Sequence, residues 1–160
     1  MEGIGHKVNS REVFSSSEEV KEYYGEMRRS KFKGWGKALM NNLEVYEGEG
    51  EEGLAQGWGR MQYRDGSVYT GEFRKGLRHG TGSMLFFGHG DDRYDGEWED
   101  DRPSGFGVRL SPDNKEYRGF FHRGKRHGEG TLTCFFINDE GQRILTRQDR
   151  GMWDNDVLIS

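Results

Sequence analysis

The stretch YTGEFRKGLRHGTG, residues 69–82, decides the fold, because four other segments of the chain align with it without a gap. Those segments begin at Tyr23, Tyr46, Tyr94 and Tyr117 and read YYGEMRRSKFKGWG, YEGEGEEGLAQGWG, YDGEWEDDRPSGFG and YRGFFHRGKRHGEG. A sixth, partial copy, DRGMWDND, begins at Asp149 after a wider interval, which predicts a longer loop before it. Self-similarity at a period of about 23 residues is typical of a repeat protein whose units stack on their neighbours.

Each copy has the pattern of a β-hairpin. Tyr69, Gly71 and Phe73 alternate along a first strand and therefore point to one face of it. We expect a six-residue turn over residues 74–79 and a second strand over residues 80–86. The expected register pairs are Tyr69 with Met84, Gly71 with Gly82, and Phe73 with Gly80. The glycines would leave space for neighbouring aromatic rings to lie flat across the backbone, which offsets the cost of glycine in a strand.

A large side chain follows the first glycine of most copies by two residues. It is present in five of the six copies, with Gly50 as the exception, at Met27, Phe73, Trp98, Phe121 and Trp153. Successive hairpins would pair edge to edge in an elongated, single-layer, twisted antiparallel sheet of ten to twelve strands, an all-β repeat fold. Residues 23–136 would hold five repeats, residues 1–22 a cap or arm, and residues 137–160 a longer loop, the partial copy and the C-terminal end.

Composition supports a folded chain that has no overall basic charge, while a local basic patch stays open. Only 31% of the 160 residues are hydrophobic, but the aromatic content of 13% is too high for a typical disordered segment. The net charge of -4 gives no field that would steer the protein to nucleic acid. The first residues lack the pattern of a signal peptide and Cys134 is the single cysteine, so we expect a cytoplasmic protein without disulfides.

The residues that begin each hairpin turn alternate in sign along the chain. The pairs are Arg28-Arg29, Glu51-Glu52, Arg74-Lys75, Glu99-Asp100, His122-Arg123 and Asp154-Asn155. Equivalent positions lie two strands apart, about 10 Å, a gap that long side chains can narrow. We interpret the alternation as a ladder of complementary charges that sets register, while ordinary solvated turn residues are the alternative.

The pattern Tyr-x-Gly-x-aromatic, turn, His-Gly-x-Gly resembles the MORN repeat (membrane occupation and recognition nexus) over about Tyr23 to Trp153. The resemblance implies a spread of roles, and a small chain made almost entirely of repeats looks most like an axonemal, radial-spoke-type or cytoskeletal scaffold subunit. It therefore implies a location in the cytoskeleton, with the axoneme of a cilium or flagellum as the first expectation, and protein partners that include other MORN proteins.

Two binding surfaces are predicted. An aromatic groove on the sheet face would hold a partner helix or peptide and would be lined by Tyr46, Tyr69, Phe73, Tyr94, Trp98, Tyr117 and Phe121. The alternative is a peripheral membrane module that binds anionic phospholipid through Arg74, Lys75, Arg78, Arg123, Lys125 and Arg126. A homodimer through the terminal edge or the groove is compatible with either. No residue pattern indicates a catalytic, metal or cofactor site, so we do not expect an enzyme.

Overall fold

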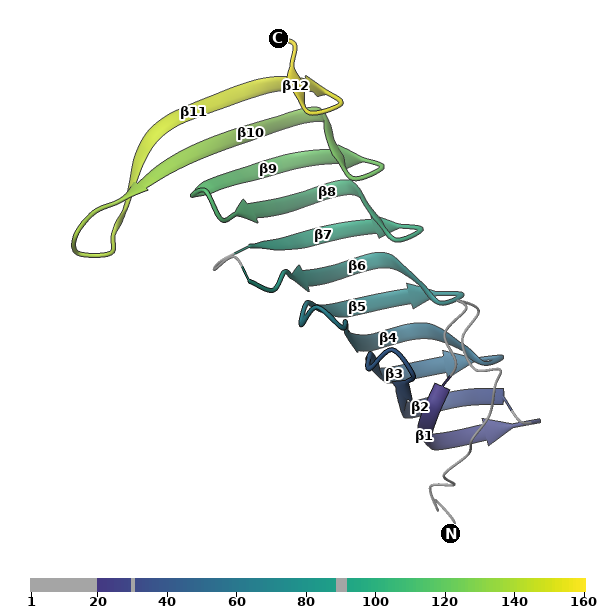
Figure 1. The fold of residues 1–160 in the computed structure, drawn as a ribbon. Coiled ribbons are helices and arrows are strands. Elements are labelled where there is room, and N and C mark those ends of the chain that lie inside the picture. Colours follow the sequence, from purple (N-terminus) through teal and green to yellow (C-terminus); the bar gives the residue numbers. More distant parts are fainter. Residues whose placement is uncertain (1–19, 30, 89–91) are drawn as a thin grey trace.

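The protein forms one long sheet. The computed structural model describes residues 20–29, 31–88 and 92–160, and these residues form a 12-stranded antiparallel sheet in which every strand pairs with its neighbours in the chain (Figure 1). The strands are β1 (Val20–Arg28), β2 (Lys31–Met40), β3 (Val45–Glu51), β4 (Leu54–Gln62), β5 (Val68–Arg74), β6 (Leu77–Leu85), β7 (Arg93–Glu99), β8 (Arg102–Ser111), β9 (Lys115–His122), β10 (Lys125–Ile137), β11 (Arg143–Asp154) and β12 (Val157–Leu158). The predicted all-β, single-layer sheet of tandem hairpins is confirmed.

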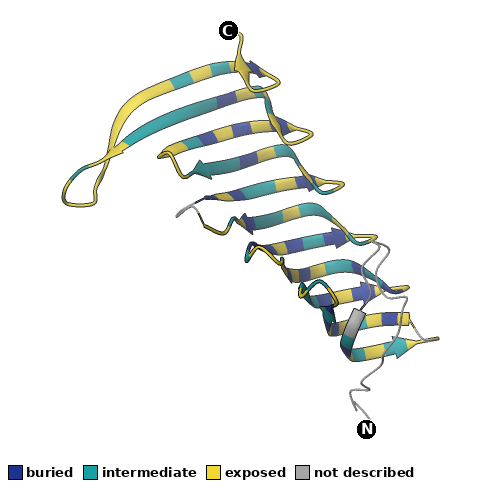
Figure 2. Cartoon of the chain, viewed as in Figure 1, coloured by how far each residue is buried: buried dark blue, intermediate teal, exposed yellow. Residues whose placement is uncertain are grey.

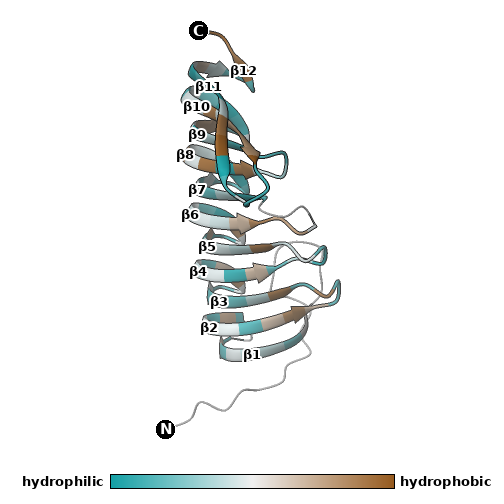
Figure 3. Ribbon diagram, turned by 90° about the vertical axis from the view of Figure 1, so that its left-hand side faces the viewer, coloured by the Kyte–Doolittle hydropathy of each residue, from teal (hydrophilic) through white to brown (hydrophobic). Residues whose placement is uncertain are grey.

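The sheet buries one of its two faces. Buried and exposed residues alternate along β5, whose burial falls on Tyr69, Gly71 and Phe73 as the spacing predicts (Figure 2). Viewed from the side, the strands stack in a single layer with no second sheet among the described residues (Figure 3). Residues 1–19 lie outside the described part of the chain, so the predicted cap or arm is described only from the start of β1.

The hairpin turns are shorter than the six residues that we expected. β5 ends at Arg74 and β6 begins at Leu77, so only Lys75 and Gly76 form the turn. Both have positive φ, 50° and 82°, which is the backbone of a type I′ turn whose twist matches that of the strands. Glycine accepts this conformation without strain, and the turns at Glu52-Gly53 and Arg123-Gly124 repeat it.

The predicted register is correct at two pairs and wrong at the third. Tyr69 lies opposite Met84 and Gly71 opposite Gly82, but Phe73 lies opposite Arg78 instead of Gly80. An irregularity between Gly71 and Phe73 leaves extra residues on β6, where Gly80 has a φ of 59°. Such bulges add local twist to a strand pair, and the same shift recurs in the hairpins β3–β4, β7–β8 and β9–β10.

Each tyrosine is fixed by the same set of contacts. The Tyr69 ring covers Gly82, where a Cβ atom would overlap the ring, and its hydroxyl donates a hydrogen bond of 2.8 Å to the Glu72 carbonyl oxygen. The other four hydroxyls donate equivalent bonds of 2.6–3.0 Å to the third residue after the tyrosine, from Tyr23, Tyr46, Tyr94 and Tyr117. The glycine columns therefore exist because a ring occupies the space of a side chain.

The buried rings form a continuous chain along the sheet. Tyr69 packs edge-to-face on Phe73 of its own hairpin at 5.1 Å between centroids and on Trp98 of the next hairpin at 5.2 Å. The same geometry continues through Tyr94, Phe121 and Tyr117 to Trp153. Edge-to-face aromatic pairs contribute about 0.5–1.5 kcal/mol beyond their buried area, so the row joins successive hairpins.

Gly50, the exception in the aromatic column, is explained by an aromatic residue from the preceding hairpin. Phe32 of β2 fills the site, and a Cβ atom at Gly50 would overlap its ring. Phe32 is fully buried and lies 4.9 Å from Tyr23 and 6.3 Å from Tyr46 between ring centroids. The row of rings therefore continues unbroken into the first hairpin.

The wide interval before the sixth copy lengthens strands more than it lengthens a loop. β10 and β11 have 13 and 12 residues, and the connection between them covers only residues 138–142. The far half of this hairpin projects beyond the neighbouring strands (Figure 1). Large apolar side chains are exposed near its tip, at Phe136, Ile137, Ile144 and Leu145.

Replacing one glycine beneath a tyrosine should destabilise the sheet strongly. Gly82→Ala places a Cβ atom within the Tyr69 ring, and overpacking of this kind costs about 1–3 kcal/mol. Urea unfolding followed by circular dichroism measures the loss. Thr81→Ala, at an exposed neighbour in the same strand, is the matched control and should change stability little. Equal stability of the two variants would contradict this role of the ring.

Alkaline pH should unfold the protein because its tyrosines are buried. Burial raises the pKa of the Tyr23, Tyr46, Tyr69 and Tyr94 hydroxyls well above the usual value, and that of Tyr63 to about 12. The unfolded chain releases these protons near pH 10, before the folded chain does, so their contribution is complete below about pH 10 and decreases above it. Thermal unfolding midpoints should fall as the pH rises from about 10 to about 12. The midpoint should fall less in Tyr69→Phe, which lacks one ionisable hydroxyl. An equal fall would contradict the assignment of this pH dependence to the buried tyrosines.

Candidate functional site

The seven residues of the predicted groove lie together on one face, but they form the core of the sheet. Tyr46, Tyr69, Phe73, Tyr94, Trp98, Tyr117 and Phe121 are neighbours in the row of rings, and their exposed fractions are 0–8%. Nearly all of their surface is thus in contact with the chain itself. The partner-binding role of this row stays a prediction. The accessible surface next to the row lies toward the C-terminal ends of the second strands of the hairpins.

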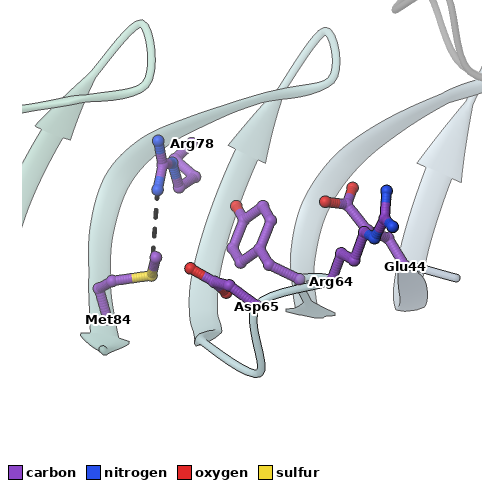
Figure 4. A pocket seen from close by; sticks show the side chains of 6 residues that line it. Glu44, Arg64, Asp65, Arg78 and Met84 are labelled. Atoms are coloured by element: carbon purple, nitrogen blue, oxygen red, sulfur yellow. Dashed lines mark hydrogen bonds between the residues drawn. The ribbon is translucent and has the colours of Figure 1, made fainter. Parts of the chain in front are cut away.

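Two hollows open on the tyrosine face beside the row of rings. The first has a volume of about 600 Å³ and is lined by Glu44, Tyr63, Arg64, Asp65, Arg78 and Met84. Figure 4 shows the charged groups of Glu44, Arg64 and Asp65 around it, with Arg78 and Met84 at its other side. The side chains come from the β3–β6 part of the sheet, so successive hairpins build this hollow together.

The second hollow has a volume of about 540 Å³ and lies over β8–β10. Its apolar lining comes from Phe86, Pro103, Tyr117, Phe121 and Leu132, and its charged lining from Arg109, Asp113, Lys115, Arg126 and Asp156. Tyr117 and Phe121 are the two predicted groove residues that reach it. Tyr63 and Phe86 were not predicted, although a large residue follows Met61 and Met84 by two positions in both copies. Leu132 occupies the same repeat position as Met61 and Met84.

The cations of the second hollow are neutralised by neighbouring aspartates. Arg109 lies 2.6 Å from Asp92 and packs over the Phe86 ring at 4.2 Å. Burial lowers the pKa of Arg109 from its usual value, and Asp92 opposes this shift. Lys115 forms an ion pair with Asp113. An apolar floor with a charge-balanced rim suits an uncharged side chain better than a phosphate group.

Arg78 joins two hairpins through a clamp that the sequence pattern did not reveal. Its backbone N–H and its Nε both donate to the Asp101 carboxylate, at 2.9 and 3.1 Å, and its terminal nitrogen donates to the Asp101 carbonyl oxygen. The guanidinium also lies 4.8 Å above the Trp98 ring. Trp98 in turn donates from its indole N–H to the Gly82 carbonyl oxygen. Asp101 occupies the second turn position with a φ of 68°, where the hairpins β3–β4, β5–β6 and β9–β10 use glycine.

The same clamp recurs two hairpins later. Arg126 makes the same three hydrogen bonds to Asp156 and lies 4.4 Å above Trp153. At the interfaces just before and just after the first clamp, the position of the arginine holds alanine or proline, that of the tryptophan holds phenylalanine, and that of the aspartate holds glycine. These sets are Ala55, Phe73 and Gly76, and Pro103, Phe121 and Gly124. Arginine, tryptophan and aspartate therefore form a matched set.

The six basic residues of the alternative prediction divide into two groups. Arg78 and Arg126 are held in the clamps, and Arg74 lies 3.5 Å from Asp100 of the next hairpin. Lys75 and Arg123 occupy exposed turn positions with positive φ, and Lys125 begins β10 at an exposed position. Three of the six basic residues, Arg74, Arg78 and Arg126, therefore contact aspartates. These aspartates balance their positive charge, so the basic surface is smaller than the sequence indicates.

The charge ladder is confirmed at one step, where Arg74 contacts Asp100. Elsewhere the turn acid contacts a base of the preceding hairpin's second strand instead of its turn. Glu52 lies 3.7 Å from Lys31, and Asp154 lies 3.2 Å from His127. These groups are mostly exposed, so each pair contributes at most about 1 kcal/mol. Backbone hydrogen bonds from a turn to the second strand of the preceding hairpin also fix the register, such as the one from the Gly76 N–H to the Ala55 carbonyl oxygen at 2.9 Å.

The C-terminal edge of the sheet is partly covered by the chain's own end. β12 pairs with Trp153 and Asp154, and Met152 exchanges backbone hydrogen bonds with Ser160 and Ile159. Thr146 lies at an irregularity in β11, a feature that hinders pairing with another strand. The predicted homodimer through this edge stays a prediction.

The described residues 20–29, 31–88 and 92–160 contain no group of three His, Cys, Asp or Glu side chains placed to hold a metal ion. In the same part of the chain, no helix has the length and hydropathy needed to cross a membrane.

Replacing arginine, tryptophan and aspartate together should destabilise the sheet less than replacing the arginine alone. Arg78→Ala removes the Nε donor to the Asp101 carboxylate and the terminal-nitrogen donor to the Asp101 carbonyl oxygen, and it should cost about 1.5–3 kcal/mol, the range for hydrogen bonds to a charged group. The triple variant Arg78→Ala, Trp98→Phe, Asp101→Gly recreates the set of the neighbouring hairpins and should recover much of this loss. Urea unfolding of both variants measures the free energy of unfolding. Arg102→Ala, at an exposed strand residue, is the control. Additive losses in the triple variant would contradict the matching.

Comparison with known proteins agrees with this geometry. The MORN repeat description matches residues 46–68, 69–89, 94–115 and 117–135, which together make up more than half of the chain. The matched residues begin with the second hairpin, and the first hairpin precedes them with the same tyrosine hydrogen bond. No match to a curated protein was found. The repeated tyrosine hairpins and this match together show that the chain belongs to the MORN repeat family.

Proposed function

We propose that this protein is a non-catalytic scaffold subunit of a ciliary axonemal, radial-spoke-like complex or of another cytoskeletal complex. MORN repeat proteins are generally non-catalytic binding modules. The observation that carries the proposal is the pair of hollows on the tyrosine face, each built by side chains of successive hairpins. A helix or extended peptide of the partner would lie along this face and insert apolar side chains into both hollows.

Rigidity of the face supports a scaffolding role. The row of edge-to-face rings and the two arginine clamps fix successive hairpins relative to one another. The floor of each hollow therefore sits on a core that does not need to rearrange when a partner binds, which lowers the entropy cost of association. Half-buried Tyr63, Phe86 and Leu132 offer apolar contact area at the rim of the row. Anchors of this kind dominate the energy of protein interfaces.

Affinity purification from native cells tests the proposal. The tagged chain should retain cytoskeletal or axonemal proteins, and Phe86→Glu should reduce their capture about tenfold or more, because it places a charge in the apolar lining. Leu85→Glu, at the exposed neighbouring residue of the opposite face, should capture them as the parent chain does. Circular dichroism checks that both variants keep the fold. An eluate without cytoskeletal proteins, or equal loss in both variants, would contradict the proposal.

The alternative is a lipid-binding module that uses the basic turns, and the structure offers it less support. Arg74, Arg78 and Arg126 are engaged with aspartates, so their charge is balanced within the sheet. Flotation with liposomes that contain phosphoinositides, at physiological salt, separates the two functions. Robust flotation that is lost in Lys75→Ala, Arg123→Ala, Lys125→Ala would favour the membrane module.

A further inference from the structure

The face opposite the tyrosines carries a row of aromatic and acidic side chains. We call it the outer row: it contains the residue after each Tyr-x-Gly and the middle residue of each Gly-x-Gly. Over β1–β5 these residues are Glu26, Trp35, Glu49, Trp58 and Glu72. Trp35 lies directly opposite Glu49, and Trp58 directly opposite Glu72. Trp35 is 57% exposed and Trp58 is 50% exposed, whereas Trp98 and Trp153 are buried.

The outer row differs in charge from the rest of the chain. It continues over β6–β10 with Thr81, Glu97, Phe106, Phe120 and Glu129. It thus contains five carboxylates and no basic residue, in a protein with 24 lysines and arginines. Phe106 and Phe120 contact each other at 5.7 Å and are also exposed. The outer row is therefore a stripe of exposed rings with carboxylates between them.

The carboxylates of the outer row are held in place by the glycines beneath them. The Glu49 carboxylate lies over Gly57, where a Cβ atom would be 2.6 Å from its oxygen. The Glu72 carboxylate accepts a hydrogen bond of 2.7 Å from the Thr81 backbone N–H, and Glu97 accepts one from the Phe106 N–H. These acids are directed along the stripe toward the following strand, where Glu49 and Glu97 lie beside the exposed rings of Trp58 and Phe106 and Glu72 lies beside Thr81.

Exposed rings next to fixed carboxylates select a cationic partner. A guanidinium can stack on an indole face and also donate to a neighbouring carboxylate, and the two interactions reinforce each other. Phosphate or carboxylate groups would instead be repelled by the acids. The pairs Glu26–Trp35 and Glu49–Trp58, in which the carboxylate lies over the glycine that precedes the tryptophan, present this combination twice, on strands β1–β2 and β3–β4.

The spacing of the two pairs specifies the conformation of the partner. Equivalent positions of successive hairpins lie two strands apart, which is about 9.6 Å. A polyproline II segment has three residues per turn and a rise of about 3.1 Å per residue, so every third side chain points the same way at intervals of about 9.3 Å. We propose that the outer row binds an extended basic segment of a partner protein, with an arginine at every third residue and its axis across the strands.

Binding of model peptides tests this proposal. A peptide of repeated Arg-Pro-Ala units should bind and change the tryptophan fluorescence, since the two exposed indoles lie in the row. The double variant Trp35→Thr, Trp58→Thr should bind about tenfold more weakly by calorimetry. Threonine is chosen because Thr81 occupies the same position in the third copy. Phe87→Thr, at an exposed aromatic residue outside the row, is the control and should bind as the parent chain does.

A second peptide separates the proposal from simple charge attraction. It has the same composition, with all of its arginines consecutive. The proposal requires the evenly spaced peptide to bind more tightly and requires Glu49→Gln to weaken that binding. Equal affinity for the two peptides, unchanged affinity in the tryptophan variant, or no binding of the spaced peptide would overturn it. The outer row and the hollows lie on opposite faces, so the Phe86→Glu experiment is not affected by this outcome.

Discussion

The structure depends on the contact between a tyrosine ring and the glycine opposite it. Each ring lies on backbone where a side chain would otherwise stand, and its hydroxyl reaches a carbonyl oxygen of its own strand. One residue type thereby supplies apolar burial, a satisfied polar group and a ring for edge-to-face packing. A sheet without a second layer has few other ways to bury surface, which is why a chain with only 31% hydrophobic residues can fold.

The tyrosine contact also explains why the proposed partner surface lies beside the aromatic row. The rings that were predicted to line a groove are buried, because they pack against glycines and against one another. Space remains only farther along the second strands, where Tyr63, Phe86 and Leu132 are half-buried. The proposed partner surface is therefore adjacent to the core and supported by it, and it does not consist of the core itself.

The repeat made the fold predictable from sequence. The features that were not predicted are the bulge near Gly80, the arginine clamps and the contact that explains Gly50. Alternation of Tyr69, Gly71 and Phe73 was sufficient to place the buried face, the strand order and two of three register pairs. It could not show the bulge near Gly80, because Glu72 holds that backbone through a hydrogen bond that spacing does not encode. The clamps were missed because Arg78, Trp98 and Asp101 belong to different copies, and comparison of equivalent columns does not show which residues of neighbouring copies touch. Gly50 likewise had no explanation until Phe32 was seen to fill its site.

The alternation of clamped and unclamped interfaces gives the array a period of two hairpins. Duplication of a single hairpin within Tyr69–Asp156 would place an arginine against phenylalanine and glycine, or an aspartate against proline. Duplication of two adjacent hairpins would restore every interface. An array built in this way is expected to grow or shrink by pairs, so the unit that evolution or an engineer can copy is about 46 residues long, twice the visible repeat.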